Sequence, residues 1–321
     1  MAAGGRGLPR GLRAIRVALD TTPLRQTRAG TARYVQALVD HLAVDVERLE
    51  YPAGTRLRTL AADTLWYPRL RPRAGTDVLH CPTFRGPFRS RTPLVVTVHD
   101  LAVLRHPEWF NRWTAAYSRL AVPRVVAAAR RVIAVSEHTK RELVDLLDVD
   151  PATIRVVPNG VEEVFRPEGP SADGDYALAV GTLEPRKNLA RIAEAVDGEL
   201  RVVGARGWGG VALPPNVTWL GDVPDEELAA LYRGARCLVY ASLYEGFGIP
   251  VAEALACGCP VVTSAGSAMA EIAGDDAVYV DPLDVASIRA GVERAFRPAP
   301  RRVAEWSDVA ARTQAVYEEV A

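Results

Sequence analysis

Short apolar runs alternate with amphipathic segments along most of this chain. The runs at residues 93–99 and 132–136 lack polar alternation, which is typical of strands buried on both faces of a parallel sheet. Between such runs, apolar residues recur at helical spacing, as at Tyr34, Leu38 and Leu42. The pattern therefore predicts an α/β fold with doubly wound parallel sheets. Strands are expected at residues 15–20, 48–51, 77–81, 93–99, 132–136 and 153–157, and then at 176–180, 200–203, 217–220, 237–241, 260–263 and 277–280.

Helix signals fall between the apolar runs, and one region lacks a clear pattern. A helical stretch over residues 107–130 contains Pro123, which is expected to kink it because proline removes a backbone hydrogen bond. Ser136 is a natural N-cap for a helix that runs through Leu147. Residues 44–76 are interrupted by prolines and glycines, so little beyond one short strand is expected there. Further helices are expected to begin near residues 188, 225, 250 and 284, and a last one covers residues 303–320.

A polar stretch rich in proline and glycine, residues 167–174, interrupts this rhythm. A chain of 321 residues also exceeds the usual size of a single hydrophobic core. We therefore expect two domains, at residues 1–166 and 167–302, followed by the helix at about 303–321. The sequence has no internal repeat of solenoid length, so a repeat architecture is not expected.

The composition is that of an ordinary soluble globular protein. No apolar run approaches the ~20 residues needed to cross a bilayer. Residues 1–13 carry three arginines but no hydrophobic segment, so we expect a disordered tail rather than a secretory signal. The cysteines lack the spacing of zinc ligands, and we expect them to pack, reduced, in the core of a cytoplasmic protein. They are Cys81, Cys237, Cys257 and Cys259.

The formal net charge of zero conceals an asymmetry between the two halves of the chain. Residues 1–166 hold 26 Lys and Arg against 16 Asp and Glu, and residues 167–321 hold 13 against 23. The basic first half suggests an anionic partner, such as a membrane surface, a lipid phosphate or an acidic saccharide, but a solvated arginine-rich face explains the charge better because no block of consecutive like charges appears. No nucleic-acid-binding motif accompanies the charge, so nucleic acid is not an expected partner.

Residues 240–263 hold the most informative local pattern, a strand, a glycine-rich loop, a helix and a strand. Pro250 suits the first turn of that helix and Gly258 suits the left-handed position that ends it. Backbone N–H groups at the helix start favour a phosphate, whereas Glu245 and Glu253 on either side suit hydroxyl groups. A sugar joined to a nucleotide diphosphate offers both. The alternative is an ordinary strand-to-helix turn with a solvated Glu253.

Four separated motifs together resemble the GT4-type retaining glycosyltransferases, also described as glycosyl transferases group 1, which have the GT-B fold. The motifs are Thr-Val-His-Asp-Leu at 97–101, Val-Pro-Asn-Gly-Val at 157–161, Val-Gly-Thr-Leu-Glu-Pro-Arg-Lys-Asn-Leu at 180–189, and the Glu245-x7-Glu253 pair. Their order and spacing agree with the family from about Arg16 to the C-terminus. The resemblance implies two Rossmann-like domains facing a cleft, with the acceptor in the first domain and the nucleotide-sugar donor in the second. It also implies that the last helix packs back on the first domain.

The resemblance implies roles for individual residues. Arg186 and Lys187 would neutralise the donor diphosphate in place of a metal, so neither a metal nor a cofactor is expected. Glu245 would hold hydroxyls of the transferred sugar, Glu253 would hold the ribose, and His99 would reach across the cleft towards the sugar. The remaining positions implied to contact the donor are Gly30, Gly181, Thr182, Gly246, Phe247, Gly248 and Ile249.

The sequence departs from the family pattern at two places. Thr182 stands where many relatives have arginine, so Arg186 is expected to supply that guanidinium from another angle. Ala32 stands where many relatives have a second glycine after Gly30, which puts the phosphate contact of that loop in doubt.

The implied function is transfer of a hexose, of mannose or glucose type, from a nucleotide diphosphate sugar to a hydroxyl of a saccharide or lipid-linked acceptor, as in polysaccharide biosynthesis. We expect retention of configuration, no metal, and peripheral contact of the basic half with the inner face of an anionic membrane. Two alternatives stay open: a sugar-nucleotide epimerase with a GT-B-like fold, and a catalytically silent subunit that binds a sugar nucleotide or a membrane surface. The loop at 205–210 should read the donor, but its composition names no base or hexose.

Overall fold

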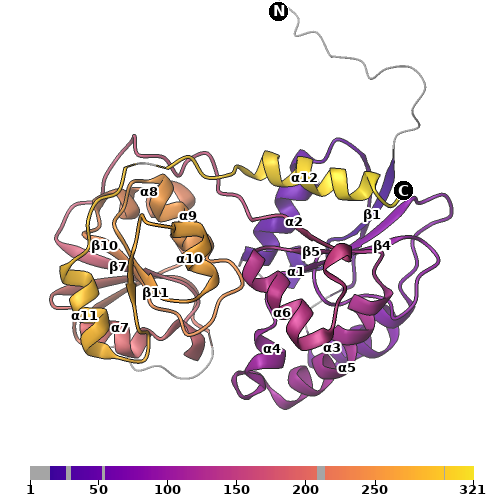
Figure 1. The fold of residues 1–321 in the computed structure, drawn as a ribbon, viewed down its shortest axis with the longest axis horizontal. Coiled ribbons are helices and arrows are strands. Elements are labelled where there is room, and N and C mark those ends of the chain that lie inside the picture. The colour runs from indigo at the N-terminus through magenta and orange to yellow at the C-terminus, as the bar shows by residue number, and fades with distance from the viewer. Residues whose placement is uncertain (1–14, 27–29, 53–54, 208–213, 300) are drawn as a thin grey trace, which may run out of the picture.

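The computed structural model describes residues 15–26, 30–52, 55–207, 214–299 and 301–321. It contains two parallel six-stranded sheets, one in each half of the chain, with helices packed around them (Figure 1). The strand order is β2-β1-β3-β4-β5-β6 in the first sheet and β12-β11-β10-β7-β8-β9 in the second. The predicted fold class, two Rossmann-like domains facing a cleft, is confirmed. The predicted disordered tail at residues 1–13 lies outside the described residues.

The first domain is built on β1 (Arg16–Asp20), β2 (Asp45–Leu49), β3 (Val78–Cys81), β4 (Leu94–Val98), β5 (Arg131–Ala134) and β6 (Ile154–Val156). Its helices are α1 (Pro23–Gln26), α2 (Gly30–His41), α3 (Arg56–Ala61), α4 (Ala102–Arg105), α5 (Arg112–Ala128) and α6 (Glu137–Leu147). Short π and 3₁₀ turns are η1 (Ala62–Trp66), η2 (Tyr67–Arg69), η3 (Pro107–Trp109) and η4 (Pro151–Thr153).

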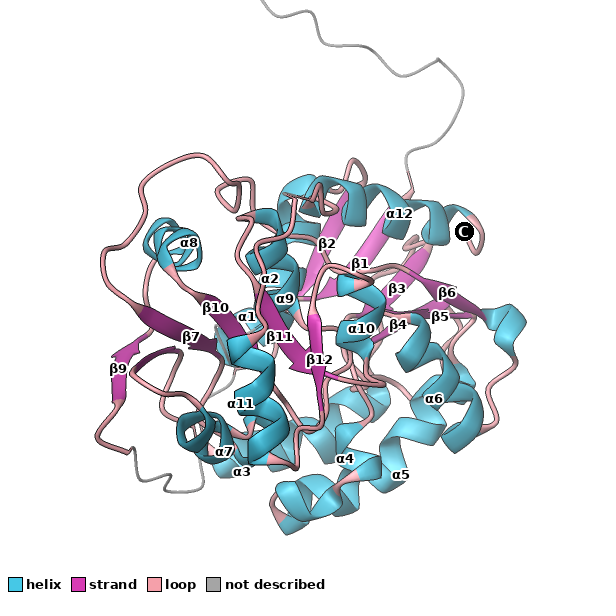
Figure 2. Cartoon of the chain, turned by 60° about the vertical axis from the view of Figure 1, so that its left-hand side comes forward, coloured by secondary structure: helices cyan, strands magenta, loops and turns pink. Residues whose placement is uncertain are grey.

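The second domain is built on β7 (Tyr176–Val180), β8 (Glu199–Val203), β9 (Val217–Gly221), β10 (Cys237–Tyr240), β11 (Val261–Ser264) and β12 (Val278–Val280). Its helices are η5 (Pro185–Lys187), α7 (Leu189–Ala195), α8 (Asp225–Gly234), α9 (Ile249–Ala256), α10 (Ala268–Ala273) and α11 (Val285–Glu293). Figure 2 shows both sheets with these helices around them, and the last helix, α12 (Trp306–Glu318), lying over the first sheet.

Several helix boundaries follow from the capping residues that the sequence offers. The Ser136 hydroxyl accepts from the backbone N–H of Thr139 at the start of α6, as predicted. Asp284 caps α11 in the same way, through the N–H of Ala286. Gly258, just after α9, has a φ of 67°, so it occupies the left-handed conformation expected of a residue that ends a helix.

The structure corrects the sequence interpretation in the first domain. Residues 44–76 contain the helix α3 and the turns η1 and η2, in which Ala62, Asp63 and Tyr67 are buried and Asp63 is bound by Arg85 and Trp113. The predicted helix over residues 107–130 begins only at Arg112, where Asn111 caps it. Gly30 opens α2 rather than lying in the preceding loop.

The C-terminal helix α12 packs against α2 and adds its apolar side to the core of the first domain. Trp306 and Tyr317 are buried among residues of α2 and β1 such as Tyr34. The chain reaches this position beside Val161, which pairs with Glu305 in an isolated parallel bridge. The close approach requires Gly160, since a β-carbon there would lie 2.7 Å from the backbone nitrogen of Trp306. In the described part of the chain, no helix has the length and apolar character needed to span a membrane.

Candidate functional site

A cleft of about 730 Å³ lies between the two domains, where the carboxyl ends of β4, β7, β8 and β10 face each other. Open α/β sheets bind ligands at this edge. Twelve residues were singled out from the sequence, and all of them line this cleft. They are Gly30, His99, Gly181, Thr182, Arg186, Lys187, Glu245, Gly246, Phe247, Gly248, Ile249 and Glu253. Ala205 lines it too, whereas residues 208–210 of the predicted donor-reading loop lie outside the described residues.

The centre of the cleft holds a carboxylate between two cations. Arg186 donates from Nη1 to Oε2 of Glu245 at 2.7 Å, and Lys187 donates from Nζ to Oε1 at 2.6 Å. Lys187 also donates to the hydroxyl of Tyr240 at 2.6 Å, and Arg186 pairs with Glu184 at 2.7 Å. The two cations predicted to meet a diphosphate are thus already neutralised by carboxylates of the protein.

The same cluster fixes the ionisation of Glu245. Burial opposes ionisation, but the charges of Arg186 and Lys187 outweigh it and lower the pKa of Glu245 to about 2. Burial also holds the pKa of Lys187 below its ordinary value, although Glu245 acts in the opposite direction. Glu245 is therefore an acceptor of hydrogen bonds at any pH near neutrality.

The second carboxylate, Glu253 of α9, is bound from across the cleft. Arg33 of α2 donates from Nη1 to Oε1 of Glu253 at 2.7 Å and from Nη2 to Asp225 of α8. The hydroxyl of Tyr232 donates to Oε2 at 2.9 Å. Burial raises the pKa of Glu253 to about 7, although Arg33 and Tyr232 favour its ionised form. Glu253 is not the solvated helix residue of the alternative interpretation.

His99, directly after β4, has a ring fixed by the first domain. Its Nε2 lies 3.0 Å from the carbonyl oxygen of Pro82, and its ring meets that of Tyr34 edge to face at 5.0 Å between centroids. Burial lowers the pKa of His99, so the neutral ring donates from Nε2 to Pro82 and keeps Nδ1 as an acceptor. Its backbone carbonyl oxygen faces Gly246 in the glycine-rich loop of the other domain.

Two glycines allow backbones to approach closely around the cleft. A β-carbon on Gly246 would lie 1.7 Å from the carbonyl oxygen of His99, and one on Gly204 would lie 2.2 Å from that of Gly181. The carbonyl oxygen of Gly246 accepts hydrogen bonds from the hydroxyls of Ser136 at 2.6 Å and Thr139 at 3.1 Å. The loop that carries Glu245 is thereby attached to the first domain.

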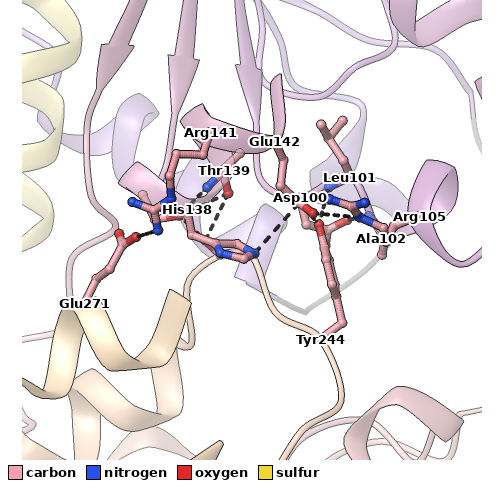
Figure 3. A network of polar contacts seen from close by, with 12 residues as sticks. Asp100, Leu101, Ala102, Arg105, His138, Thr139, Arg141, Glu142, Tyr244 and Glu271 are labelled. Atoms are coloured by element: carbon pink, nitrogen blue, oxygen red, sulfur yellow. Dashed lines mark hydrogen bonds and ion pairs between the residues drawn. The ribbon is translucent and has the colours of Figure 1, made fainter. Parts of the chain in front are cut away.

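Figure 3 shows the polar network on the other side of that loop, where Tyr244 reaches into the first domain. Its hydroxyl donates to Glu142 of α6 and accepts from the backbone N–H of Leu101 at 3.1 Å. Arg105 completes the network with a contact of 3.2 Å to Glu142. Glu245 thus lies between two residues, Tyr244 and Gly246, that are both bound by the first domain.

Sequence reasoning missed several residues of this site. Tyr240 lies in an apolar run that predicts only a strand, and Tyr232 occupies an apolar position of an ordinary amphipathic helix. Arg33 directly follows Ala32 in the segment that was compared with the family pattern, but only Gly30 of that segment was singled out as a site residue. The position of Arg33 in that segment is the one signal that could have found it.

Two family models match the chain over complementary parts. The model described as Glycosyltransferase Family 4 matches residues 17–164, and the model described as Glycosyl transferases group 1 matches residues 210–305. The chain is similar to O-antigen chain mannosyltransferase B of Escherichia coli, with 29% identity over 87% of this chain and 90% of that protein. It is also 31% identical to the MMP alpha-(1->4)-mannosyltransferase of Mycolicibacterium hassiacum, over 70% of this chain and 65% of that protein.

Solved structures share the arrangement of the two domains. Sucrose-phosphate synthase from Thermosynechococcus elongatus superposes with a TM-score of 0.67 at 20% identity, over 95% of this chain and 96% of that chain. Anabaena HepE in complex with UDP-glucose superposes with a TM-score of 0.65 at 17% identity, over 96% of this chain and 95% of that one. At such identities the likeness concerns the fold.

Proposed function

The chain belongs to the GT4-type glycosyltransferases, and from this premise we propose that it moves a hexose to an acceptor hydroxyl with retention of configuration and without a metal. The donor is a nucleotide diphosphate sugar, and the acceptor is a saccharide or a lipid-linked saccharide of polysaccharide biosynthesis. The observation that carries the proposal is the pair of partly buried cations, Arg186 and Lys187, held by buried Glu245 in the centre of the cleft.

Donor binding on this proposal is an exchange of partners. The donor diphosphate forms ion pairs with Arg186 and Lys187. It also accepts hydrogen bonds from backbone N–H groups at the start of α9, because Gly248 provides no side chain to cap that helix. Glu245 is released from its cations and accepts hydroxyls of the transferred sugar instead. Fixed positive charge then performs the neutralisation that a metal performs in other transferases.

Transfer follows on one face of the sugar. The bond between the anomeric carbon and the β-phosphate oxygen breaks, the acceptor oxygen bonds to the same carbon from the same face, and the acceptor proton passes to the leaving phosphate. Arg186 and Lys187 stabilise the charge that develops on that phosphate. His99 contributes through the position of its backbone carbonyl and ring, and no enzymic base is required.

The test is single replacement of Lys187 and of Glu245 by alanine, with release of nucleoside diphosphate as the measurement. We expect each variant to lose at least ~100-fold in turnover, the loss typical of removing one charge-stabilising group. Near-wild-type turnover in both variants would refute the proposed roles of these two residues.

The donor is proposed to be GDP-mannose first and UDP-glucose second, since the similar O-antigen protein is named a mannosyltransferase. Thermal shift across a panel of nucleotide sugars ranks the two. Conversion of the donor into an epimeric sugar nucleotide without any acceptor would favour the epimerase, and release of free nucleotide without acceptor would indicate hydrolysis. Donor binding without turnover across an acceptor panel would favour a silent binding subunit.

Contact with an anionic membrane is proposed through α5 and the neighbouring α3–η1 segment of the first domain. Between Arg112 and Ala128 the sequence has no acidic residue, and the exposed positions of α5 are arginine, tryptophan, leucine or alanine. Leu65 of η1 is 60% exposed, and Trp113 of α5 is 43% exposed and donates to Asp63 of η1. Basic and apolar side chains on one surface suit a lipid interface.

Sedimentation with vesicles tests this contact. The protein should bind vesicles of phosphatidylglycerol and not of phosphatidylcholine, and Leu65→Glu should weaken binding. The control is Leu283→Glu, since Leu283 of the second domain is 64% exposed. Equal binding to both lipids, or equal loss in both variants, would count against the proposal.

A further inference from the structure

Arg33 belongs to the first domain, but its guanidinium lies between two helices of the second. Its Nη1 lies 2.7 Å from Oε1 of Glu253 on α9, and its Nη2 pairs with Asp225 on α8. The Arg33 side chain is 28% exposed and the Glu253 side chain 3%. A single side chain of α2 therefore crosses the cleft and connects the two helices that border the donor side.

Glu253 keeps acceptor capacity in this arrangement. Arg33 donates to one carboxylate oxygen and the Tyr232 hydroxyl donates to the other at 2.9 Å. A carboxylate has about four acceptor sites, so two are used. Since Glu253 lines the cleft, a diol could bind there without displacing either partner.

The charges around Glu253 make Arg33 its principal counter-ion. Asp225 of α8 disfavours ionisation of Glu253. Tyr232 of α8 and Cys257, directly after α9, are neutral because burial raises the pKa of each. Glu162 lies near the Arg33–Asp225 pair and adds a further negative charge. Removing the guanidinium would thus favour the protonated carboxyl, which accepts hydrogen bonds more weakly than the ion does.

Resting on the proposed donor site, we propose that Arg33 is a positioning residue that holds the Glu253 carboxylate in place for the two ribose hydroxyls of a nucleoside diphosphate. The first domain then completes the ribose subsite of the second. Because the contact spans the cleft, recognition of the ribose requires both domains to be packed as they are here.

The test compares a nucleotide that has the ribose hydroxyls with one that lacks them. GDP and 2′,3′-dideoxy-GDP are titrated calorimetrically into the wild type and Arg33→Met at pH 7 and pH 9; if the donor panel selects uridine, UDP and its dideoxy analogue are used. We expect the wild type to prefer the hydroxylated nucleotide by ~10-fold or more, since charged acceptors bind hydroxyls strongly. Arg33→Met should lose this preference at pH 7 and recover part of it at pH 9, because the higher pH favours the ionised form of Glu253.

Two further variants make the result specific to the charge at this position. Arg33→Lys keeps a cation and should retain part of the preference. Arg141→Met is the matched control, because Arg141 also joins the two domains, through Glu271 at 2.6 Å, but is 61% exposed and does not line the cleft. It should keep the wild-type preference at both pH values.

The outcomes separate this inference from the proposed function. An Arg33→Met variant with the wild-type preference, or with a loss that pH does not change, would overturn the role of Arg33. The same loss in Arg141→Met would assign the effect to domain packing and overturn it too. A wild type that binds neither GDP nor UDP would reject the proposed donor itself.

Discussion

Replacing Glu245 by glutamine should unbalance the charges at the centre of the cleft. The carboxylate is 9% exposed and contacts Arg186 at 2.7 Å and Lys187 at 2.6 Å. At an effective dielectric constant of about 20, unit charges at this separation attract by roughly 6 kcal/mol per pair. Desolvation of the three groups offsets much of this, and removing one partner of a buried pair typically costs about 3–5 kcal/mol. Because Arg186 keeps Glu184, we expect the free energy of unfolding to fall by about 3 kcal/mol.

A ligand should reverse this loss. The diphosphate of GDP brings negative charge to the same two cations, so GDP should stabilise Glu245→Gln at least as much as it stabilises the wild type. At a free concentration 100-fold above Kd, the gain is about 2.7 kcal/mol, close to the amount lost. Urea unfolding followed by circular dichroism, with and without GDP, measures both quantities.

A second carboxylate supplies the control for this experiment. Glu319 also lies between two arginines, Arg131 at 2.8 Å and Arg155 at 2.7 Å, but it is 34% exposed and is remote from the cleft. Glu319→Gln should cost about 1 kcal/mol or less and should respond to GDP as the wild type does. Equal losses in Glu245→Gln and Glu319→Gln, or weaker stabilisation of Glu245→Gln by GDP, would refute the reasoning.

Three other changes test neighbouring parts of the site. The folded pKa of Glu253, about 7, exceeds the ordinary 4.5, so this carboxyl destabilises the wild type increasingly as pH rises from 4.5 to 7. The free energy of unfolding of Glu253→Gln should therefore rise relative to that of the wild type by roughly 1.4 kcal/mol per pH unit in that range. Urea unfolding of both proteins at pH 5 and pH 7.5 measures this difference, and a difference that does not change with pH would contradict the raised pKa. Gly246→Ala would bring a β-carbon to 1.7 Å from the carbonyl oxygen of His99, which belongs to the other domain. The domains would have to move apart, so we expect a ~100-fold loss of turnover and a larger radius of gyration in X-ray scattering. An unchanged rate would contradict the close approach. Tyr244→Phe should lower the free energy of unfolding by about 1–3 kcal/mol because its buried hydrogen bonds are lost. Tyr279→Phe loses only an exposed hydrogen bond and should change the free energy of unfolding little, so similar values in the two variants would rule out the network.

The sheets could be predicted from the sequence because their strands are uninterrupted apolar runs. The run at 93–99 contains β4 and the run at 132–136 overlaps β5, each within about two residues of the observed bounds. Residues 44–76 could not be predicted in the same way. Their helical turns are fixed by tertiary contacts, such as the bond from Trp113 to buried Asp63, which no local pattern records.

The residues of the site also differ in whether the sequence could predict them. Motif spacing brought together Arg186, Lys187 and Glu245, whose backbones lie on two adjacent strand ends of one sheet. The partner of Glu253 is 220 residues away in the sequence and belongs to the other domain. Such a pair depends on how the domains pack, and a single sequence contains no periodicity that reports it.

Because of this packing, residues of the first domain position the two carboxylates of the second domain. Glu245 belongs to the second domain, but its neighbours Tyr244 and Gly246 are bound by side chains of α6 and its N-cap in the first. Glu253 also belongs to the second domain, but its counter-ion Arg33 comes from the first. Both carboxylates proposed to hold the donor are therefore positioned across the cleft. Separation of the domains would loosen the sugar and the ribose contacts together, so donor binding and domain closure should be thermodynamically coupled.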